Sequence, residues 1–198
     1  MSRLPLADPE ELSGFLRTLH DESGPNTPLL PNIARVFAPA SELLESFIAW
    51  YLPWHMNQPG AETRLPVRVK ELVRLRLATF SGCKACKTAR MAEDLIPEEQ
   101  AVGLDEDLTA FSPAEQAALR FAEKFALDHF SIDDDDFAIL REHFDDAQIL
   151  ELVVLTGVIY LGFGRALSVL QLENVSCPLP PSPVSSSRNE QPVAGGVG

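Results

Sequence analysis

One long apolar helix constrains the fold more than any other feature of this sequence. Asp145 or Asp146 can cap a helix that runs from Ala147 to about Leu172, and from Leu152 to Leu161 this helix is apolar on nearly every side. Such a helix must be covered by other elements, so it lies at the centre of a bundle or between subunits. The longest uncharged stretch, Leu152 to Gly164, is too short to span a bilayer, and no membrane partner is expected.

Helix signals dominate the rest of the chain as well. Asp8 and Pro9 provide an N-cap and a first-turn proline, and Ser112 with Glu115 has the spacing of a capping box. Apolar residues recur at mixed three- and four-residue steps in the segments between these signals. The expected helices are Leu12–Leu19, Asn32–Phe37, Ser41–Tyr51, Pro66–Phe80, Cys83–Leu95, Ser112–Phe130, Phe137–Phe144 and Ala147–Leu172. The sequence therefore predicts an all-α fold of about seven or eight helices.

Two polar features interrupt this pattern. Trp54 and His55 fall in a predicted loop that begins at Pro53, where they can line the mouth of a pocket or simply pack. The run Asp133–Asp136 precedes a helix and does not have the glycine-turned spacing of a calcium loop. We interpret this run as an N-cap with an acidic first turn rather than as a metal site.

The composition limits the size and the partners of the protein. At 198 residues and 45% apolar, the chain can bury the core of one domain, and it has no repeat at a fixed period. A formal net charge of −13 disfavours nucleic acid as a partner, because phosphates attract clusters of Lys and Arg. Three cysteines are too few for a disulfide-stapled secreted domain, and the first residues show no apolar signal-peptide core. A cytoplasmic location is therefore expected.

The segment Glu71–Met91 contains the most distinctive chemistry. Cys83 and Cys86 form a Cys-x-x-Cys pair at the junction where one helix ends and the next is expected to begin. Free N–H groups at the start of the second helix favour the thiolate form, so the sulfurs are expected to be nucleophilic and able to form a disulfide. Arg90 follows Cys86 by four residues and would share its helical face. There it can hold a thiolate by charge but cannot take a proton.

Glu71 has two interpretations. A helical wheel places it with Leu75 and Ala78, roughly opposite the core-facing stripe of the helix Pro66–Phe80. If another element packs on that side, the carboxyl is partly desolvated and its pKa rises toward the range useful for proton transfer. Alternatively, Glu71 forms an ordinary surface pair with Arg74 at i,i+3. The wheel alone leaves both interpretations open.

A family resemblance rests on these residues. The local pattern resembles the signature of the AhpD-like alkylhydroperoxidase branch of the carboxymuconolactone decarboxylase family. It consists of Glu71, the eleven residues after it, and the pair Cys83 and Cys86. The segment Phe137–Leu170, with Arg165 near its end, resembles the last two helices of that family. The resemblance extends from about Leu29 to Glu173. It implies an AhpD-like helical bundle with a helical-hairpin core, assembled as a homo-oligomer such as a trimer or hexamer.

The resemblance also suggests how the chain is divided. An N-terminal helix and linker would occupy residues 1–28, and the family domain residues 29–176. The remaining residues, 177–198, are rich in Pro, Ser and Gly and are predicted to be disordered.

Roles for the cysteines follow from the same resemblance. In the cysteine-bearing branch the second cysteine attacks a peroxide and the first resolves it as a disulfide, which implies these roles for Cys86 and Cys83; a glutamate and a histidine assist proton transfer. The full family pattern is C-x-H-C-x-x-x-H, and this chain has Ala85 and Arg90 where the histidines stand. Loss of the second histidine removes the imidazole best placed to move protons near pH 7, so turnover can be weak even with both sulfurs present.

The sequence supports three functional hypotheses. The first is a thiol-dependent peroxidase or disulfide oxidoreductase in which Cys86, Cys83 and Glu71 act on a hydroperoxide. A dithiol, such as a lipoyl or thioredoxin-like protein, would then restore the thiols. It requires no metal or organic cofactor, since two cysteines fall short of the four ligands of a zinc site and Cys177 is distant. The second is a lyase or isomerase for a small carboxylated lactone or related metabolite, with cationic anchors at Arg74, Arg76 or Arg165. The third is a non-catalytic oligomeric helical protein.

Overall fold

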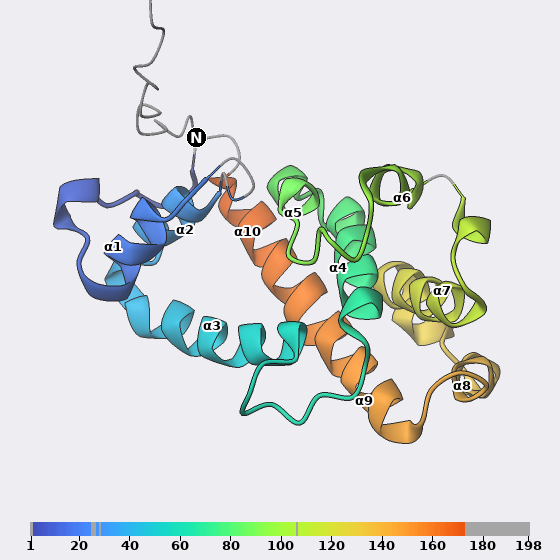
Figure 1. Cartoon of the computed structure of the whole chain (residues 1–198). Coiled ribbons are helices and arrows are strands. Elements are labelled where there is room, and N and C mark those ends of the chain that lie inside the picture. The colour runs from blue at the N-terminus through green and yellow to red at the C-terminus, as the bar shows by residue number, and fades with distance from the viewer. Residues whose placement is uncertain (1, 25–26, 28, 106, 173–198) are drawn as a thin grey trace, which may run out of the picture.

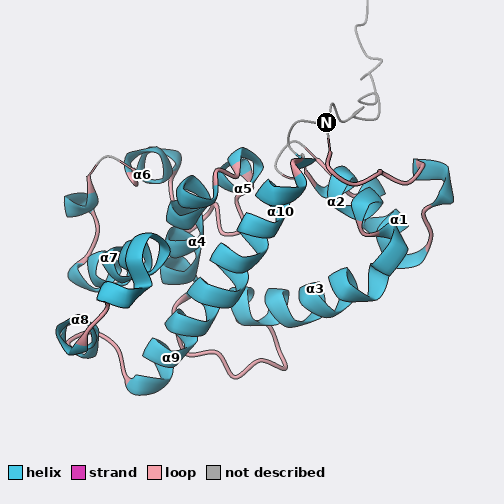
Figure 2. Ribbon diagram, turned by 180° about the vertical axis from the view of Figure 1, so that it is seen from behind, coloured by secondary structure: helices cyan, strands magenta, loops and turns pink. Residues whose placement is uncertain are grey.

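A computed structural model describes residues 2–24, 27, 29–105 and 107–172 of the chain. The regular structure within these ranges is helical, without strands (Figure 2). The α-helices are α1 (Gly14–Asp21), α2 (Leu30–Val36), α3 (Ser41–Met56), α4 (Val67–Ser81), α5 (Lys84–Thr88), α6 (Glu98–Gly103), α7 (Pro113–Asp128), α8 (Asp134–Arg141), α9 (Asp146–Val154) and α10 (Gly164–Leu170). The predicted all-α class is confirmed. Cys177 and the tail predicted to be disordered lie outside the described residues.

The predicted long apolar helix forms the centre of the fold. It runs from Asp146 to Leu170 through α9, a π-helical segment (Leu155–Phe163) and α10. Figure 1 shows this central helix crossing the middle of the molecule, with α1 and α2 on one side and α6, α7 and α8 on the other. Its length and composition alone would suffice to cross a membrane, but it packs against α4 and α7 as the core helix of a globular domain does.

Two hydrophobic clusters hold the helices together. The first joins α4, α7 and the central helix, and its fully buried members include Leu72, Leu77 and Leu119. The second joins α1, α2 and α10 and contains Cys83. Because residues before and after position 28 share the second cluster, the N-terminal segment packs onto the rest of the chain. The predicted division at that position stays a prediction.

The predicted capping chemistry is present at the starts of α7 and α8. The capping box at Ser112 is present at the start of α7. The Asp133 carboxylate accepts two backbone N–H groups at the start of α8, which confirms that the acidic run is an N-cap. Asp8 differs from the prediction, because it caps only a short 3₁₀ turn and α1 begins after Ser13.

The predicted loop around His55 is wrong. Helix α3 continues through Pro53 and ends at Met56, where Asn57 takes a left-handed conformation with φ 53°. A proline inside a helix removes one backbone donor, but the apolar residues on either side of Pro53 pack against the first cluster and keep the helix in place. This extra turn places His55 in the interior.

Candidate active site

Helix α4 brings two charged side chains into the centre of the site. Its predicted core stripe, which includes Val69, Val73 and Leu77, is buried as expected. Glu71 and Arg74 are buried as well, because α3, α7 and the central helix all pack against α4. The helix is thus covered on more than one side, and the interpretation of Glu71 as a desolvated residue is confirmed.

The Glu71 carboxylate accepts hydrogen bonds at both oxygens. Oε2 accepts from Arg74 Nε at 2.7 Å and from His55 Nε2 at 3.1 Å. Oε1 accepts from Arg74 Nη2 at 2.7 Å and from the backbone N–H of Met91 at 2.9 Å. Burial by itself raises the pKa of this carboxyl, but the hydrogen bonds from Arg74 and His55 outweigh burial and lower the pKa to about 2. The predicted rise in pKa is therefore wrong, and the Arg74 pair forms in the interior rather than on a wet face.

These contacts define what Glu71 can do. A carboxylate offers about four acceptor positions, and here four hydrogen bonds fill them. With a pKa of about 2 the group is ionised at neutral pH and has no open position for a proton. The geometry suits Glu71 to hold its neighbours in place rather than to carry protons.

His55 connects Glu71 to the central helix. The fully buried ring places Nδ1 at 2.7 Å from the Tyr160 hydroxyl and Nε2 at 3.1 Å from Glu71 Oε2. Burial lowers the pKa of His55 below its ordinary value, although the hydrogen bond to Glu71 opposes that shift, so the ring is neutral at pH 7. An ionised carboxylate only accepts hydrogen bonds, so Nε2 carries the proton and Nδ1 accepts from the Tyr160 O–H. Burial also raises the pKa of Tyr160, which keeps this hydroxyl protonated.

The two cysteines of the motif are bonded as a disulfide at the start of α5. Helix α4 ends at Ser81, and its C-cap is Gly82, whose φ of 66° lies in the left-handed region that glycine adopts without strain. The cysteine Cα atoms are 5.2 Å apart, and the Cys86 N–H donates to Cys83 Sγ at 3.1 Å. Cys83 is only 2% exposed within the second cluster, whereas Cys86 is half-buried and lines a pocket. The two sulfurs therefore differ in access.

Glu71 and Arg74 hold the chain that follows the disulfide. Arg74 Nη1 donates to the backbone carbonyl of Cys86 at 2.8 Å, and Nη2 donates to that of Ala89. The N–H of Met91 donates to Glu71. A longer helix would need these same backbone groups, so α5 ends two residues after Cys86 and its predicted extension is wrong.

Arg90 has other partners than predicted. It lies beyond the end of α5, so the predicted helical face shared with the cysteines does not form. Its Nη1 lies 2.5 Å from Glu98 Oε2, and its Nη2 donates to the carbonyl of Ile96. These contacts fix the loop that leads into α6. The cation bonded to the backbone of Cys86 is Arg74.

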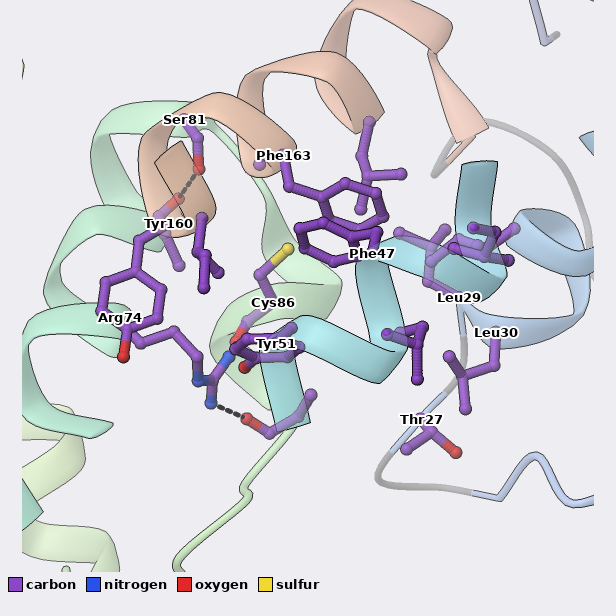
Figure 3. A pocket seen from close by; sticks show the side chains of 18 of the residues that line it. Thr27, Leu29, Leu30, Phe47, Tyr51, Arg74, Ser81, Cys86, Tyr160 and Phe163 are labelled. Carbon is purple, nitrogen blue, oxygen red and sulfur yellow. Dashed lines mark hydrogen bonds between the residues drawn. The ribbon is translucent and has the colours of Figure 1, made fainter. Parts of the chain in front are cut away.

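Cys86 lies in the wall of an apolar pocket of about 170 Å³ (Figure 3). The rings of Phe47 and Phe163 stack with centroids 4.0 Å apart, and the Cys86 sulfur points toward them in Figure 3. Arg74 is the only charged residue in the described lining. The remaining lining residues are Leu19, Thr27, Leu29, Leu30, Ile33, Leu44, Ile48, Tyr51, Ala78, Ser81, Ala89, Ile159, Tyr160, Gly164 and Leu167.

The chemistry of this site does not point to a metal. In the described part of the chain, no three His, Cys, Asp or Glu side chains gather in a way that could hold a metal ion. The polar groups around Glu71 already bond to one another, and the pocket wall is largely apolar. The arrangement suits thiol chemistry on an apolar substrate.

The fold brings together more of the site than the sequence predicts. Glu71, Cys83 and Cys86 do meet through Arg74. The sequence suggests Arg74 as a surface partner of Glu71 or as an anchor for a lactone, but not as a link to the cysteines. The i+3 spacing of Glu71 and Arg74 indicates their pairing, but no local signal indicates that Arg74 also bonds to the backbone of Cys86. Tyr160 has no such signal, because 105 residues separate it from its partner His55.

Comparisons with known proteins identify the fold. No family model and no curated protein matches the sequence. Among solved structures, an uncharacterized peroxidase-related protein from Silicibacter sp. TM1040 matches with a TM-score of 0.66 and 21% identity, over 85% of this chain and 88% of that one. A second, described as an alkylhydroperoxidase AhpD core and an uncharacterized peroxidase-related protein from Ralstonia eutropha JMP134, matches with a TM-score of 0.63 and 20% identity, over 86% and 90%. The chain has an AhpD-like fold.

The AhpD-like fold confirms the resemblance that the sequence predicts. In the sequence, Arg90 stands where the pattern of the resembled family has a histidine. In this chain the imidazole bonded to Glu71 belongs to His55 of α3. The site therefore contains a histidine next to its glutamate, supplied by α3.

Proposed function

We propose that this protein is a thiol-dependent peroxidase that reduces hydroperoxides with Cys83 and Cys86. The observation that carries the proposal is the position of the two sulfurs. They are bonded to each other, Cys86 lines an apolar pocket, and Cys83 is buried behind it. A molecule in the pocket would meet Cys86 first, which fits Cys86 as the attacking residue and Cys83 as the resolving one. The AhpD-like fold shared with two peroxidase-related proteins supports the same class of reaction.

The reaction proceeds in two balanced steps. The Cys86 thiolate attacks the terminal oxygen of the hydroperoxide, an S–O bond forms as the O–O bond breaks, and the departing alkoxide takes a proton to become an alcohol. The resulting sulfenic acid is attacked by the Cys83 thiolate, which forms the disulfide and expels hydroxide that is protonated to water. One peroxide is reduced to an alcohol and water while two thiols are oxidised.

Glu71 has an orienting role in this proposal. The carboxylate fixes the Arg74 guanidinium, and Arg74 in turn holds the carbonyls of Cys86 and Ala89. This clamp keeps Cys86 close to Cys83 when the disulfide opens, so that the second step stays intramolecular and fast. His55 and Tyr160 hold the carboxylate from the other side.

The proposed catalytic cycle also requires a reductant, and it includes a cellular location and an oligomeric state. A dithiol such as a lipoyl or thioredoxin-like protein would attack the half-buried Cys86 sulfur and release both thiols, becoming a disulfide itself. A cytoplasmic location and assembly as a trimer or hexamer belong to the same proposal. Exposed apolar side chains on the central helix are consistent with assembly; they are Leu150, Val154, Val158 and Val169.

Mass spectrometry after mild peroxide treatment tests the proposal. The reduced protein should rapidly lose two hydrogens, mapped to Cys83 and Cys86, and consume one peroxide per disulfide formed. Cys86→Ser should abolish this consumption, whereas Cys83→Ser should stop after one peroxide with sulfenic acid on Cys86. Cys177→Ser, which removes the cysteine outside the motif, is the matched control and should keep full turnover. Slow oxidation at scattered residues would count against a peroxidase.

The lactone-directed alternative has less support from the site. Arg76 pairs with Glu123 and Asp105, and Arg165 donates to a backbone carbonyl of α7. Arg74 lines the pocket, but its guanidinium bonds to Glu71 and to two carbonyls. A carboxylated substrate would have to displace one of these contacts. Activity that survives alkylation of both motif cysteines would favour this alternative.

A further inference from the structure

The far wall of the pocket is built by the N-terminal arm, which we define as α1, α2 and the described residues between them. Leu19, Leu29, Leu30 and Ile33 of this arm line the pocket, facing residues of α3 and the central helix. Figure 3 shows Leu29, Leu30 and Thr27 at one end of the pocket, with Cys86 and Arg74 toward the other. A molecule that reacts at Cys86 therefore extends toward the arm.

The arm and the N-terminal residues before it are anchored to the C-terminal end of the central helix. Arg3 donates through its backbone N–H to the Leu170 carbonyl at 3.0 Å, and Asn32 Nδ2 donates to the Leu172 carbonyl at 3.1 Å. Within the N-terminal part, Arg35 Nε donates to the Ala7 carbonyl at 2.7 Å. These bonds hold the leucines in position without a ligand, so the pocket is preformed.

Size and polarity limit what the pocket can hold. An apolar cavity of about 150 Å³ in a protein core binds a benzene ring. The volume of about 170 Å³ beside Cys86 accordingly admits a hydrocarbon group of about six carbons or more. Arg74 is the only charged group in the described lining and is already paired, and the net charge of the chain is −13. An anionic group would lose its hydration there without a partner and would be repelled on approach.

We propose that the N-terminal arm determines substrate specificity, and that it selects uncharged hydroperoxides carrying a hydrocarbon group of about six carbons or more. The inference rests on the proposed peroxidase function and adds the substrate class. The terminal oxygen of the hydroperoxide goes to Cys86, and the alcohol product leaves with its hydrocarbon group still against the arm. Each methylene that enters the pocket should raise kcat/KM about fourfold.

Steady-state kinetics with hydrogen peroxide, tert-butyl hydroperoxide and cumene hydroperoxide test the selection. The kcat/KM values should rise in that order, with cumene hydroperoxide at least tenfold above tert-butyl hydroperoxide. Leu30→Asn places an amide in the pocket wall and should lower the ratio of kcat/KM for cumene hydroperoxide to that for hydrogen peroxide by about tenfold. Leu6→Asn is the matched control, because Leu6 is also a half-buried member of the second cluster but lies outside the pocket lining. It should leave that ratio unchanged.

A second measurement does not depend on turnover. In the reduced protein, 1-octanol, an analogue of the alcohol product, should slow alkylation of Cys86 by iodoacetamide at least fivefold near saturation. Ethanol and octanoate at the same concentration should protect less. Leu30→Asn should weaken the protection by 1-octanol about tenfold, and Leu6→Asn should not.

The outcomes separate the two proposals. If Cys86-dependent turnover is present but is equal for all three hydroperoxides, or if Leu30→Asn and Leu6→Asn behave alike, the specificity inference is overturned and the peroxidase function stands. If 1-octanol and octanoate protect Cys86 equally, the inference that the pocket selects uncharged groups is overturned. If 1-octanol protects Cys86 through Leu30 but no hydroperoxide is consumed, the peroxidase function fails, and with it the substrate assignment.

Discussion

Replacing Glu71 with glutamine tests the central electrostatic claim about this site. The side chain keeps its shape, but it loses its charge and puts an amide N–H₂ where two donors already point. The pKa of Glu71 is lowered from an ordinary 4.5 to about 2 by its partners. That difference corresponds to about 3 kcal/mol of folding free energy at pH 7. Glu71→Gln should lower the free energy of unfolding by about this amount, and the melting temperature by roughly 6–12 °C.

The sign of the pH dependence follows from the lowered pKa. A carboxyl whose pKa is lower in the folded protein contributes its full stability above the unfolded pKa, and it loses that contribution as the pH falls toward 2. Glu71→Gln lowers the free energy of unfolding, and the part of that loss due to the missing charge should therefore shrink from about 3 kcal/mol at pH 7 to about 2 kcal/mol at pH 3.5. Urea unfolding of the wild-type protein and of Glu71→Gln, at one fixed protein concentration and at both pH 7 and pH 3.5, measures this change.

Glu123→Gln is the matched control for this experiment. Glu123 also pairs with an arginine, at 2.6 Å from Arg76 Nε, but both side chains are partly exposed. Glu123→Gln should lower the free energy of unfolding by no more than about 1 kcal/mol, because water and salt weaken exposed ion pairs. A Glu71→Gln deficit as small as that of Glu123→Gln, or one that is the same at both pH values, would refute the claim that a buried, ionised carboxylate holds this site together.

Three further substitutions have defined outcomes. Tyr160→Phe leaves the Nδ1 acceptor of His55 buried without its donor. It should lower the free energy of unfolding by about 1–3 kcal/mol, measured by urea denaturation at pH 7. An unchanged free energy of unfolding would mean that the Tyr160 hydroxyl does not bond to His55. Gly164→Ala would bring a Cβ to 3.1 Å from Ser81 Oγ, and this contact should appear as an unfavourable coupling of about 1 kcal/mol with Ser81 in a double-mutant cycle with Ser81→Gly, measured by urea denaturation. Arg90→Met removes the contacts of Arg90 with Glu98 and Ile96, so it should lower the melting temperature. It should change the alkylation rate of Cys86 less than twofold. A larger change in that rate would indicate that Arg90 acts directly on Cys86.

Local sequence signals predicted the helices whose causes are local. The capping box at Ser112 and the acidic cap at Asp133 need only residues three positions apart, and both are present. The central helix was predicted because a run that is apolar on all sides can only be stable when covered. The end of α5 was not predictable in this way. It depends on Arg74 and Glu71, which take backbone groups that the local sequence would leave to a helix.

The protonation state of the site was equally beyond local reasoning. From the wheel, burial of Glu71 suggests a raised pKa, and burial alone does act in that direction. The outcome is reversed because Arg74 approaches with two N–H groups and His55 arrives from α3 across a turn that the sequence assigned to a loop. Whether a buried acid is neutral or ionised depends on its partners, and these are chosen by packing.

The sequence by itself determined the helical class, the position of the Cys83 and Cys86 pair at a helix junction, and the family that these residues resemble, because each of these depends on spacing along the chain. The tertiary structure alone decided that His55 and Tyr160 join Glu71, that Arg74 rather than Arg90 bonds to the backbone of Cys86, and that the N-terminal arm closes the pocket. The physical reason is that these contacts join residues far apart in sequence. Their geometry is fixed only when α4 is buried between its neighbours.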